Sequence, residues 1–472
     1  MNPSQPTPPN PDFGSQKGAI LLVATVASFL TPFMGSSITV ALPPIGREFA
    51  ADAIEMSWVP TAYLLAAAVF LVPFGRLADI RGRKKVFTIG IALYTIASLL
   101  SAVASSIYWL IGFRVLQGMG GAMIFSTGVA IVTSVYPPGE RGKVFGLVVA
   151  AVYAGLSLGP FAGGILTQHL GWRSVFYLNL VLGAIPFVLM LWKVKGEWAE
   201  AKGEKFDLIG SVIYGVALVT LMIGLSQLPD LLGAGLIAAG VAGLVGFTWW
   251  ELHSDTPVLN IDLFRKSKVF AFSNLAAFIN YSATFGVTFL MSLYLQYVKG
   301  LNPQGAGSVL VSMPIMMALL SPYAGKLSDR LESRVVASIG MAITVVALGI
   351  LAFLTLDTPL WFIIAALALN GVGFAFFSSP NTNAVMSSVE RKFYGVGSAI
   401  QATMRLTGQM FSMGLAMLIL AVFVGKVEIT PEHYPAFVTS TKTAFVLFAS
   451  LCFVGVFVSL ARGNMRDSNS KV

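Results

Sequence analysis

Apolar stretches of about 20 residues recur along the whole chain, and a helix of that length crosses roughly 30 Å of hydrocarbon. Strands are a poor alternative, because the stretches are too long for membrane strands and lack their alternation of apolar and polar residues. Hydrophobic residues make up 56% of the sequence and charged residues only 11%, which differs strongly from the composition of soluble domains. The sequence therefore predicts an all-α, multi-pass membrane protein.

The apolar stretches predict fourteen transmembrane helices. We expect these helices at residues 18–43, 57–78, 86–105, 107–136, 144–167, 173–193, 207–228, 231–250, 269–297, 305–326, 334–355, 359–386, 394–424 and 441–461. The single cysteine, Cys452, lies in the last stretch, so no intramolecular disulfide is expected.

A repeated phrase divides the chain into two halves. Gly75-x-Leu-x-Asp79 recurs 250 positions later as Gly325-x-Leu-x-Asp329. The two helices expected within 207–250 have no counterpart in this repeat. We therefore predict two six-helix bundles with a two-helix insertion between them.

The segment before the inserted helices, 193–205, is rich in charges of both signs, which is typical of a solvated linker. The inserted helices carry no charge inside the membrane, and we expect them not to line a substrate path. The predicted parts are a disordered tail at 1–17, an N-terminal bundle at 18–193, the linker and accessory helices at 194–268, a C-terminal bundle at 269–461 and a cytoplasmic tail at 462–472.

The net charge of +9 has a topological explanation. If the N-terminus is cytoplasmic, 23 of the 30 Lys and Arg residues fall in cytoplasmic segments and 5 fall outside. Positive residues collect on the cytoplasmic side of membrane proteins. We therefore expect both chain ends in the cytoplasm and no nucleic acid as a partner.

Several function classes find no support in the sequence. The phosphate-binding loop of ATP-driven pumps, Gly-x4-Gly-Lys-Ser/Thr, does not occur. Three histidines and one cysteine give no metal-ligand spacing, so we expect no metal site and no cofactor. An intramembrane enzyme would need a nucleophile, a base or a metal cluster at depth, and none is visible, so we expect that the protein is not an enzyme.

Four short motifs follow one another at successive helices. They are Gly75-x-Leu-Ala-Asp79-x-x-Gly82-Arg83-Lys84, Arg114-Val-Leu-Gln117-Gly118, Gly155-Leu-Ser-Leu-Gly159-Pro160-Phe-Ala-Gly163-Gly164 and Trp172-Arg173-Ser-Val-Phe176-Tyr-Leu-Asn179. In this order they resemble the signatures of the major facilitator superfamily and its fourteen-span drug:proton antiporters. The resemblance covers residues 18–461.

The resemblance implies a secondary transporter of the cell membrane that exports drug-like amphiphiles by alternating access, with a proton as coupling ion. We expect a monomer in contact with membrane lipid. The resemblance further implies a conformational latch and a helix that opens and closes one side of the cavity. The latch residues would be Gly75, Asp79, Gly82, Arg83 and Asp329, and the helix would carry Gly155, Gly159, Pro160, Gly163 and Gly164.

One departure from the family pattern concerns the proton. Met34 stands where the family usually has an acid on the first helix, and Thr39 where it has an asparagine. All 21 acidic residues fall in loops or at expected helix ends. An alternative is therefore an exporter or flippase of lipid-like or anionic amphiphiles, with weak or no proton coupling.

Polar residues inside the expected helices are candidates for a substrate cavity. A buried cation in hydrocarbon marks a functional site by default, and two are expected, Arg114 and Arg405. Arg114 has a structural alternative, in which it binds main-chain carbonyls of the first helix near Gly35. The complete set of candidates for the cavity is Arg114, Arg405, Met34, Asn280, Tyr281, Asn381 and Gln401.

Overall fold

The computed structural model describes residues 16–136, 138–254, 257–259, 262–389, 394–425 and 427–463. Within these ranges the chain is helical, without any strand. Fourteen helical segments are long and apolar enough to cross a membrane. The predicted fold class is confirmed.

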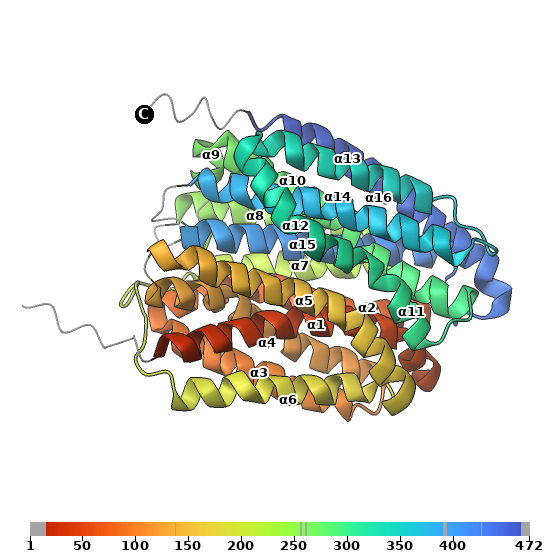
Figure 1. The fold of residues 1–472 in the computed structure, drawn as a ribbon, viewed down its shortest axis with the longest axis horizontal. Helices are drawn as coiled ribbons and strands as arrows, with labels where there is room; N and C mark the ends of the chain where they lie inside the picture. The colour runs from red at the N-terminus through yellow and green to blue at the C-terminus, as the bar shows by residue number, and fades with distance from the viewer. Residues whose placement is uncertain are drawn as a thin grey trace, which may run out of the picture.

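The N-terminal half forms one six-helix bundle, coloured red to yellow in Figure 1. Close packing depends on glycine at several crossings, because a Cβ at Gly118 would lie 2.8 Å from the Cβ of Ala66 on the neighbouring helix. The six helices are α1 (Lys17–Phe49), α2 (Ala53–Arg81), α3 (Arg83–Ala102), α4 (Ile107–Val135), α5 (Pro138–Leu170) and α6 (Arg173–Trp192).

The C-terminal half forms the second bundle, coloured green to blue. One of its six spans is divided into α11 and α12, and the span that begins with α10 ends in a short π-helix. Its elements are α10 (Lys268–Leu293), η2 (Tyr294–Val298), α11 (Pro303–Leu310), α12 (Ser312–Arg330), α13 (Ser333–Leu351), α14 (Leu360–Ser387), α15 (Tyr394–Phe423), η4 (Pro431–His433) and α16 (Tyr434–Leu460).

The inserted pair, α7 (Leu208–Gln227) and α8 (Leu231–His253), forms a hairpin outside the two bundles, and short α9 (Asp262–Lys266) follows it. Helix α7 contacts α2 of the first bundle and α15 of the second. The hairpin therefore lies over the seam along which these two helices meet.

Several helices are longer than their sequence patterns predict, and α1 and α16 show the reason. Helix α1 continues to Phe49 rather than ending at 43, and α16 begins at Tyr434 rather than at 441. The added residues Ile45, Phe437 and Val438 are buried. Packing against neighbouring helices therefore extends both elements past the prolines and hydroxyl residues that marked their expected ends.

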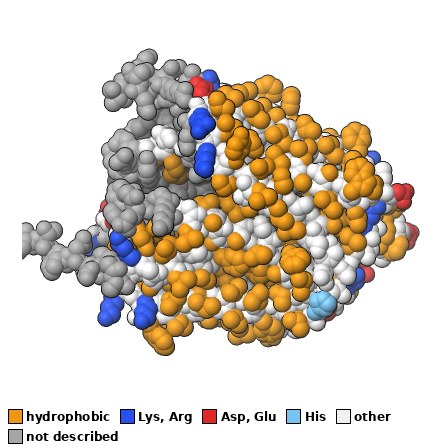
Figure 2. Space-filling model, in the orientation of Figure 1, with side chains coloured by type: hydrophobic (Ala, Val, Ile, Leu, Met, Phe, Trp, Pro, Cys, Tyr) orange, Lys and Arg blue, Asp and Glu red, His pale blue; other side chains and the backbone are white. Residues whose placement is uncertain are grey.

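Figure 2 shows a broad hydrophobic band across the face in view, with charged side chains at its two edges. Many large apolar side chains of the molecule are exposed, among them Leu231 and Trp192. An apolar surface of this extent suits hydrocarbon rather than water. Helix α1 begins and α16 ends at the same edge, at the left in Figure 1, and we call this edge the terminal side and the opposite edge the far side.

Candidate functional site

The loop that carries the first motif is a sharp turn between α2 and α3 on the terminal side. Gly82 joins the two helices with a φ of +113°, in a region that favours glycine. A Cβ at this position would also lie 2.6 Å from Cγ of Glu197. Gly82 is therefore required by its backbone, and a side chain here would also displace the side chain of Glu197.

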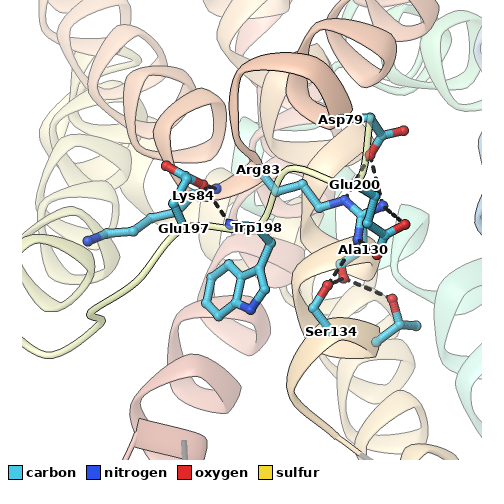
Figure 3. A network of polar contacts seen from close by, with 9 residues as sticks. Asp79, Arg83, Lys84, Ala130, Ser134, Glu197, Trp198 and Glu200 are labelled. Atoms are coloured by element: carbon cyan, nitrogen blue, oxygen red, sulfur yellow. Dashed lines mark hydrogen bonds and ion pairs between the residues drawn. The ribbon is translucent and has the colours of Figure 1, made fainter. Parts of the chain in front are cut away.

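Arg83 is the centre of a polar network at this turn (Figure 3). Its Nε donates to Asp79 at 2.8 Å, and Nη1 donates to Ser134 of α4 at 2.9 Å. Both terminal nitrogens also bind the carboxylate of Glu200, at 2.7 and 2.9 Å. Such a two-point contact fixes the guanidinium in one orientation. The arginine is 8% exposed, and its charge is balanced by two carboxylates that are themselves partly exposed.

The segment before α7 also binds the main chain of the turn between α2 and α3. The Glu197 carboxylate accepts from the backbone N–H groups of Lys84 at 2.7 Å and Lys85 at 3.1 Å, and so caps the first turn of α3. The N–H of Ala201 donates to the carbonyl of Asp79 at 3.0 Å, and the N–H of Arg83 donates to the carbonyl of Trp198 at 2.8 Å.

The segment 193–205, expected as a solvated linker, is mostly exposed, but it also makes specific contacts with the signature loop. Glu204 adds an ion pair with Arg76 at 2.6 Å, and Val194 and Ala201 are buried. We call Glu197–Glu204 the clamp segment. Its mixed charges were read as a sign of solvation, although the acids lie opposite the cations of the signature loop.

The structure places the partners of Asp79 in the N-terminal half and the clamp segment. Its side chain binds Arg83 and is 37% exposed. Gly75 lies on α2 one turn earlier, where a Cβ would contact Ser126 of α4 at 3.4 Å. The side chain of Asp329, the repeat partner of Asp79, lies outside the described residues. A latch between the two bundles stays a prediction.

Hydrogen bonds join the two bundles on the far side. Ser292 of α10 donates to the carbonyl of Thr39 at 2.6 Å, and Gln296 of η2 donates to the carbonyl of Val40 at 2.9 Å. Both acceptors lie on α1. The bundles are therefore closed against each other at the end opposite the signature loop.

The glycines of α5 divide between two neighbours. Three of them face α1. A Cβ would lie 2.6 Å from the carbonyl oxygen of Phe29 at Gly155, 2.9 Å from that of Phe33 at Gly159, and 2.8 Å from Cα of Ser37 at Gly163. A Cβ at Gly164 would instead lie 2.6 Å from the carbonyl of Pro303 on α11, in the other bundle. The carbonyl of Pro160 likewise faces Gly307 of α11. The motif thus packs α5 within its bundle and also forms part of the far-side closure.

Arg114 lies inside the N-terminal bundle and is 1% exposed. Its Nε donates to the carbonyl of Val59 on α2 at 3.1 Å, it also donates to Gln117, and its guanidinium lies 4.6 Å from the ring centre of Tyr63. The carbonyl that it binds therefore belongs to α2 and not to α1 near Gly35.

Arg405 lies between the bundles and is half-buried. Its guanidinium is 5.4 Å from the ring centre of Phe125 on α4. No hydrogen bond or ion pair of Arg405 is found within the part of the chain that the structure describes. Nearby, Tyr153 of α5 faces Ser321 and Ser378 of the other half.

The remaining candidates for the cavity separate into two groups. Tyr281 lies in the region of Arg405, while Met34 and Asn280 are buried in helix packing. Asn381 and Gln401 lie nearer the terminal side, where Asn381 donates to the carbonyl of Ser273 at 3.1 Å and Gln401 donates to Thr382 at 2.7 Å. We call Phe125, Tyr153, Tyr281 and Arg405 the central site. Tyr153 was missed because a single tyrosine in an apolar helix gives no distinctive pattern.

Arg462, expected in a cytoplasmic tail, is instead 1% exposed in the C-terminal bundle. It donates to the carbonyl of Ser459 at 2.8 Å, to Ser273 at 3.1 Å and to Asn381 at 3.0 Å. Burial, with a further contribution from Arg334, lowers the pKa of Arg462 to about 10. Residues from 464 onward lie outside the described residues, as do residues 1–15 of the N-terminal tail expected at 1–17, whose last residue, Lys17, begins α1. Among those described, no three His, Cys, Asp or Glu side chains are grouped to hold a metal ion.

Comparison with known proteins gives a consistent result. The family model described as Major Facilitator Superfamily matches residues 24–208 and 274–471, which are the two halves without the inserted hairpin. The riboflavin transporter RibZ of Clostridioides difficile (strain 630) is 28% identical over 450 residues, covering 94% of this chain and 97% of that protein. The multidrug resistance protein Stp of Mycobacterium tuberculosis (strain ATCC 25618 / H37Rv) is 30% identical over 406 residues, 84% of this chain and 75% of that protein. A bacterial homolog of the human lysosomal transporter Spinster, solved in an inward-facing and unoccupied conformation, shares the fold with a TM-score of 0.65 and 16% identity over 97% of this chain and 98% of that chain.

Proposed function

Because the chain belongs to the major facilitator superfamily, we propose that it is a proton-coupled exporter of drug-like or amphiphilic small molecules that works by alternating access. The observation that carries this proposal is the central site, which lies between the two bundles. Among the contacts described above, the hydrogen bonds that join the bundles lie on the far side of this site. Three aromatic rings and a cation between rigid halves suit a flexible, mostly apolar substrate. The name of the multidrug resistance relative supports export of drugs.

The topology that we propose determines which side of the membrane each end of the molecule faces. The Lys and Arg asymmetry assigns the terminal side to the cytoplasm of a cell membrane. The far-side closure would then face the outside, and export would require that substrate reaches the central site from the cytoplasmic side. We propose a monomer, because each chain contains both halves that must rock against each other.

A second candidate function is export of anionic or lipid-like amphiphiles with weak proton coupling. Arg405 favours this second function. The cation is half-buried, and among the described residues no carboxylate forms an ion pair with it. A cation in a low-dielectric cavity attracts anions and repels cations. Arginine also does not release its proton in the physiological range.

Transport in proteoliposomes distinguishes the two functions. We expect an imposed pH gradient to drive a cationic dye across the membrane, and a protonophore to stop it. Movement of an anionic amphiphile that is unaffected by the protonophore would favour the second function. If neither compound moves faster than in protein-free vesicles, the proposal of amphiphile export is wrong.

A further inference from the structure

A cavity of about 310 Å³ lies between the inserted hairpin and the seam of the two bundles. It is separate from the far-side closure and is lined by both halves of the protein. One residue from each contributing segment defines its position: Val72 of α2, Tyr214 of α7, Phe247 of α8, Leu259, Phe278 of α10 and Met404 of α15.

The hairpin packs tightly against both bundles around this cavity. The hydroxyl of Tyr214 donates to the carbonyl of Ala68 on α2 at 3.3 Å. Further along α7, a Cβ at Gly414 of α15 would lie 2.7 Å from Leu225. Between these contacts the hairpin does not fill the space, so the cavity is a space bounded by three packed parts of the molecule.

The polar groups of the cavity wall are already paired. Its five side-chain hydroxyls each donate to a main-chain carbonyl, at distances between 2.7 and 3.3 Å. They belong to Ser211, Tyr214, Thr248, Thr403 and Thr407. A water molecule needs several polar partners, and this wall offers few. The chemistry of the wall therefore suits a hydrocarbon occupant.

The cavity begins at the depth of the terminal-side leaflet and extends towards the middle of the bilayer. Ser211 lies three residues after the start of α7, and Phe278 lies ten residues after the start of α10. At a rise of 1.5 Å per residue these positions are roughly 5 to 15 Å from the terminal-side ends of the helices, and Leu221 of α7, which also lines the cavity, extends it to about 20 Å. Thr248 is exposed on the surface of α8, so the cavity is open towards the region that lipid occupies.

The terminal-side end of the cavity has a fixed floor. Leu259 lines the cavity, and its N–H donates to the buried carboxylate of Glu251 at 2.9 Å. This contact holds the chain after α8 beneath the hairpin. We therefore infer that an occupant enters from the side, between α8 and the bundles.

We propose that this cavity binds one acyl chain of a membrane phospholipid from the leaflet on the terminal side. Because α2 and α15 belong to different bundles, the shape of the cavity changes when the bundles rock. A bound chain thus couples the inserted hairpin to the transport cycle. This assigns the hairpin a lipid-binding role that the pattern of its sequence does not reveal.

The test is residue-level mapping of photo-crosslinks in vesicles that contain a phosphatidylcholine with a diazirine on one acyl chain. We expect labelling of Met404 and Phe411 in the unmodified protein. Leu244→Trp should abolish this labelling, because Leu244 lines the cavity and a larger ring fills it. Val245→Trp is the matched control, because Val245 is 65% exposed on the lipid side of the same helix, and labelling of Met404 should persist.

A second variant keeps the proposal testable if Leu244→Trp does not fold. Phe411→Ala enlarges the cavity and should raise the labelling of Met404. Absence of label at Met404 and Phe411 in the unmodified protein would overturn the proposal, as would equal labelling in the two tryptophan variants. Loss of the label on addition of excess cationic dye would also overturn it, because the cavity would then be a substrate site.

Discussion

Arg83 and Glu200 are 117 positions apart, and they form a two-point contact with N–O distances of 2.7 and 2.9 Å. The arginine belongs to the signature loop, whereas the glutamate belongs to the segment that leads into the inserted hairpin. That segment lies outside the repeated unit of the chain. The hairpin is therefore connected to the loop whose movement is expected to accompany alternating access.

The first prediction tests this contact with Glu200→Gln. The change leaves the buried Arg83 with Asp79 as its carboxylate partner. Because the Glu200 side chain is 70% exposed, solvent screening limits the loss to about 1 kcal/mol, or about 2–4 °C in melting temperature. Transport should fall more than stability does. Glu204→Gln is the control. The ion pair of Glu204 is with Arg76, which is more exposed than Arg83, and no further bond of Arg76 depends on this pair. Equal transport by both variants would contradict a special role of the Arg83 contact.

The second prediction concerns Gly82→Ala, which combines strain with a clash. A φ of +113° is unfavourable for alanine by about 1–3 kcal/mol, and the new Cβ meets Glu197. Gly203→Ala separates the two effects, because Gly203 has a φ of +94° and open space around it. We expect Gly82→Ala to lose transport and Gly203→Ala to lose only stability, measured by thermal unfolding. The double change Gly82→Ala, Glu197→Ala removes the clash. It should still not restore transport, because it also removes the Glu197 carboxylate that caps the first turn of α3.

The third prediction applies to the latch. Asp79→Asn keeps the shape of the side chain but weakens its charge-assisted bond to Arg83. We expect a folded, inserted protein with reduced transport, and a smaller reduction for Asp329→Asn, whose loop has fewer cations. Full activity of both variants would mean that the signature loop has only an anchoring role.

The fold could be predicted from the sequence because each span is long and apolar, and because one repeat relates the two halves. The ends of α1 and α16 could not, since buried residues beyond the apolar runs extend them. The clamp segment was missed for a different reason. Its acids contact the signature loop across more than a hundred positions, and charge composition alone does not distinguish a paired carboxylate from a solvated one. Arg462 was missed similarly, because its partners Ser273 and Asn381 lie on other helices.

The fourth prediction tests the orientation of the chain. In a Cys452→Ala background, a cysteine at exposed Lys202 should react with an impermeant reagent only from the cytoplasm, and one at exposed Glu432 only from outside. An even number of spans places both chain ends on the same side of the membrane, and the basic residues indicate that this side is the cytoplasm. The two labelled positions then lie on opposite sides. Reaction of both cysteines from the same side would refute the proposed topology.

The last prediction concerns Arg405 and the charge of the substrate. Its guanidinium lies between the bundles beside the Phe125 ring, and no carboxylate among the described residues balances its charge. Arg114, in contrast, donates to Val59 and Gln117 inside one bundle. We therefore expect Arg405→Gln to fold normally and to shift the ratio of transported cationic dye to anionic amphiphile towards the cation by about tenfold, which corresponds to about 1.4 kcal/mol. Arg114→Gln should instead lower stability without changing this ratio, because it leaves a buried carbonyl without its partner. An unchanged ratio in folded Arg405→Gln, measured in the same vesicles at one pH, would remove Arg405 from substrate selection.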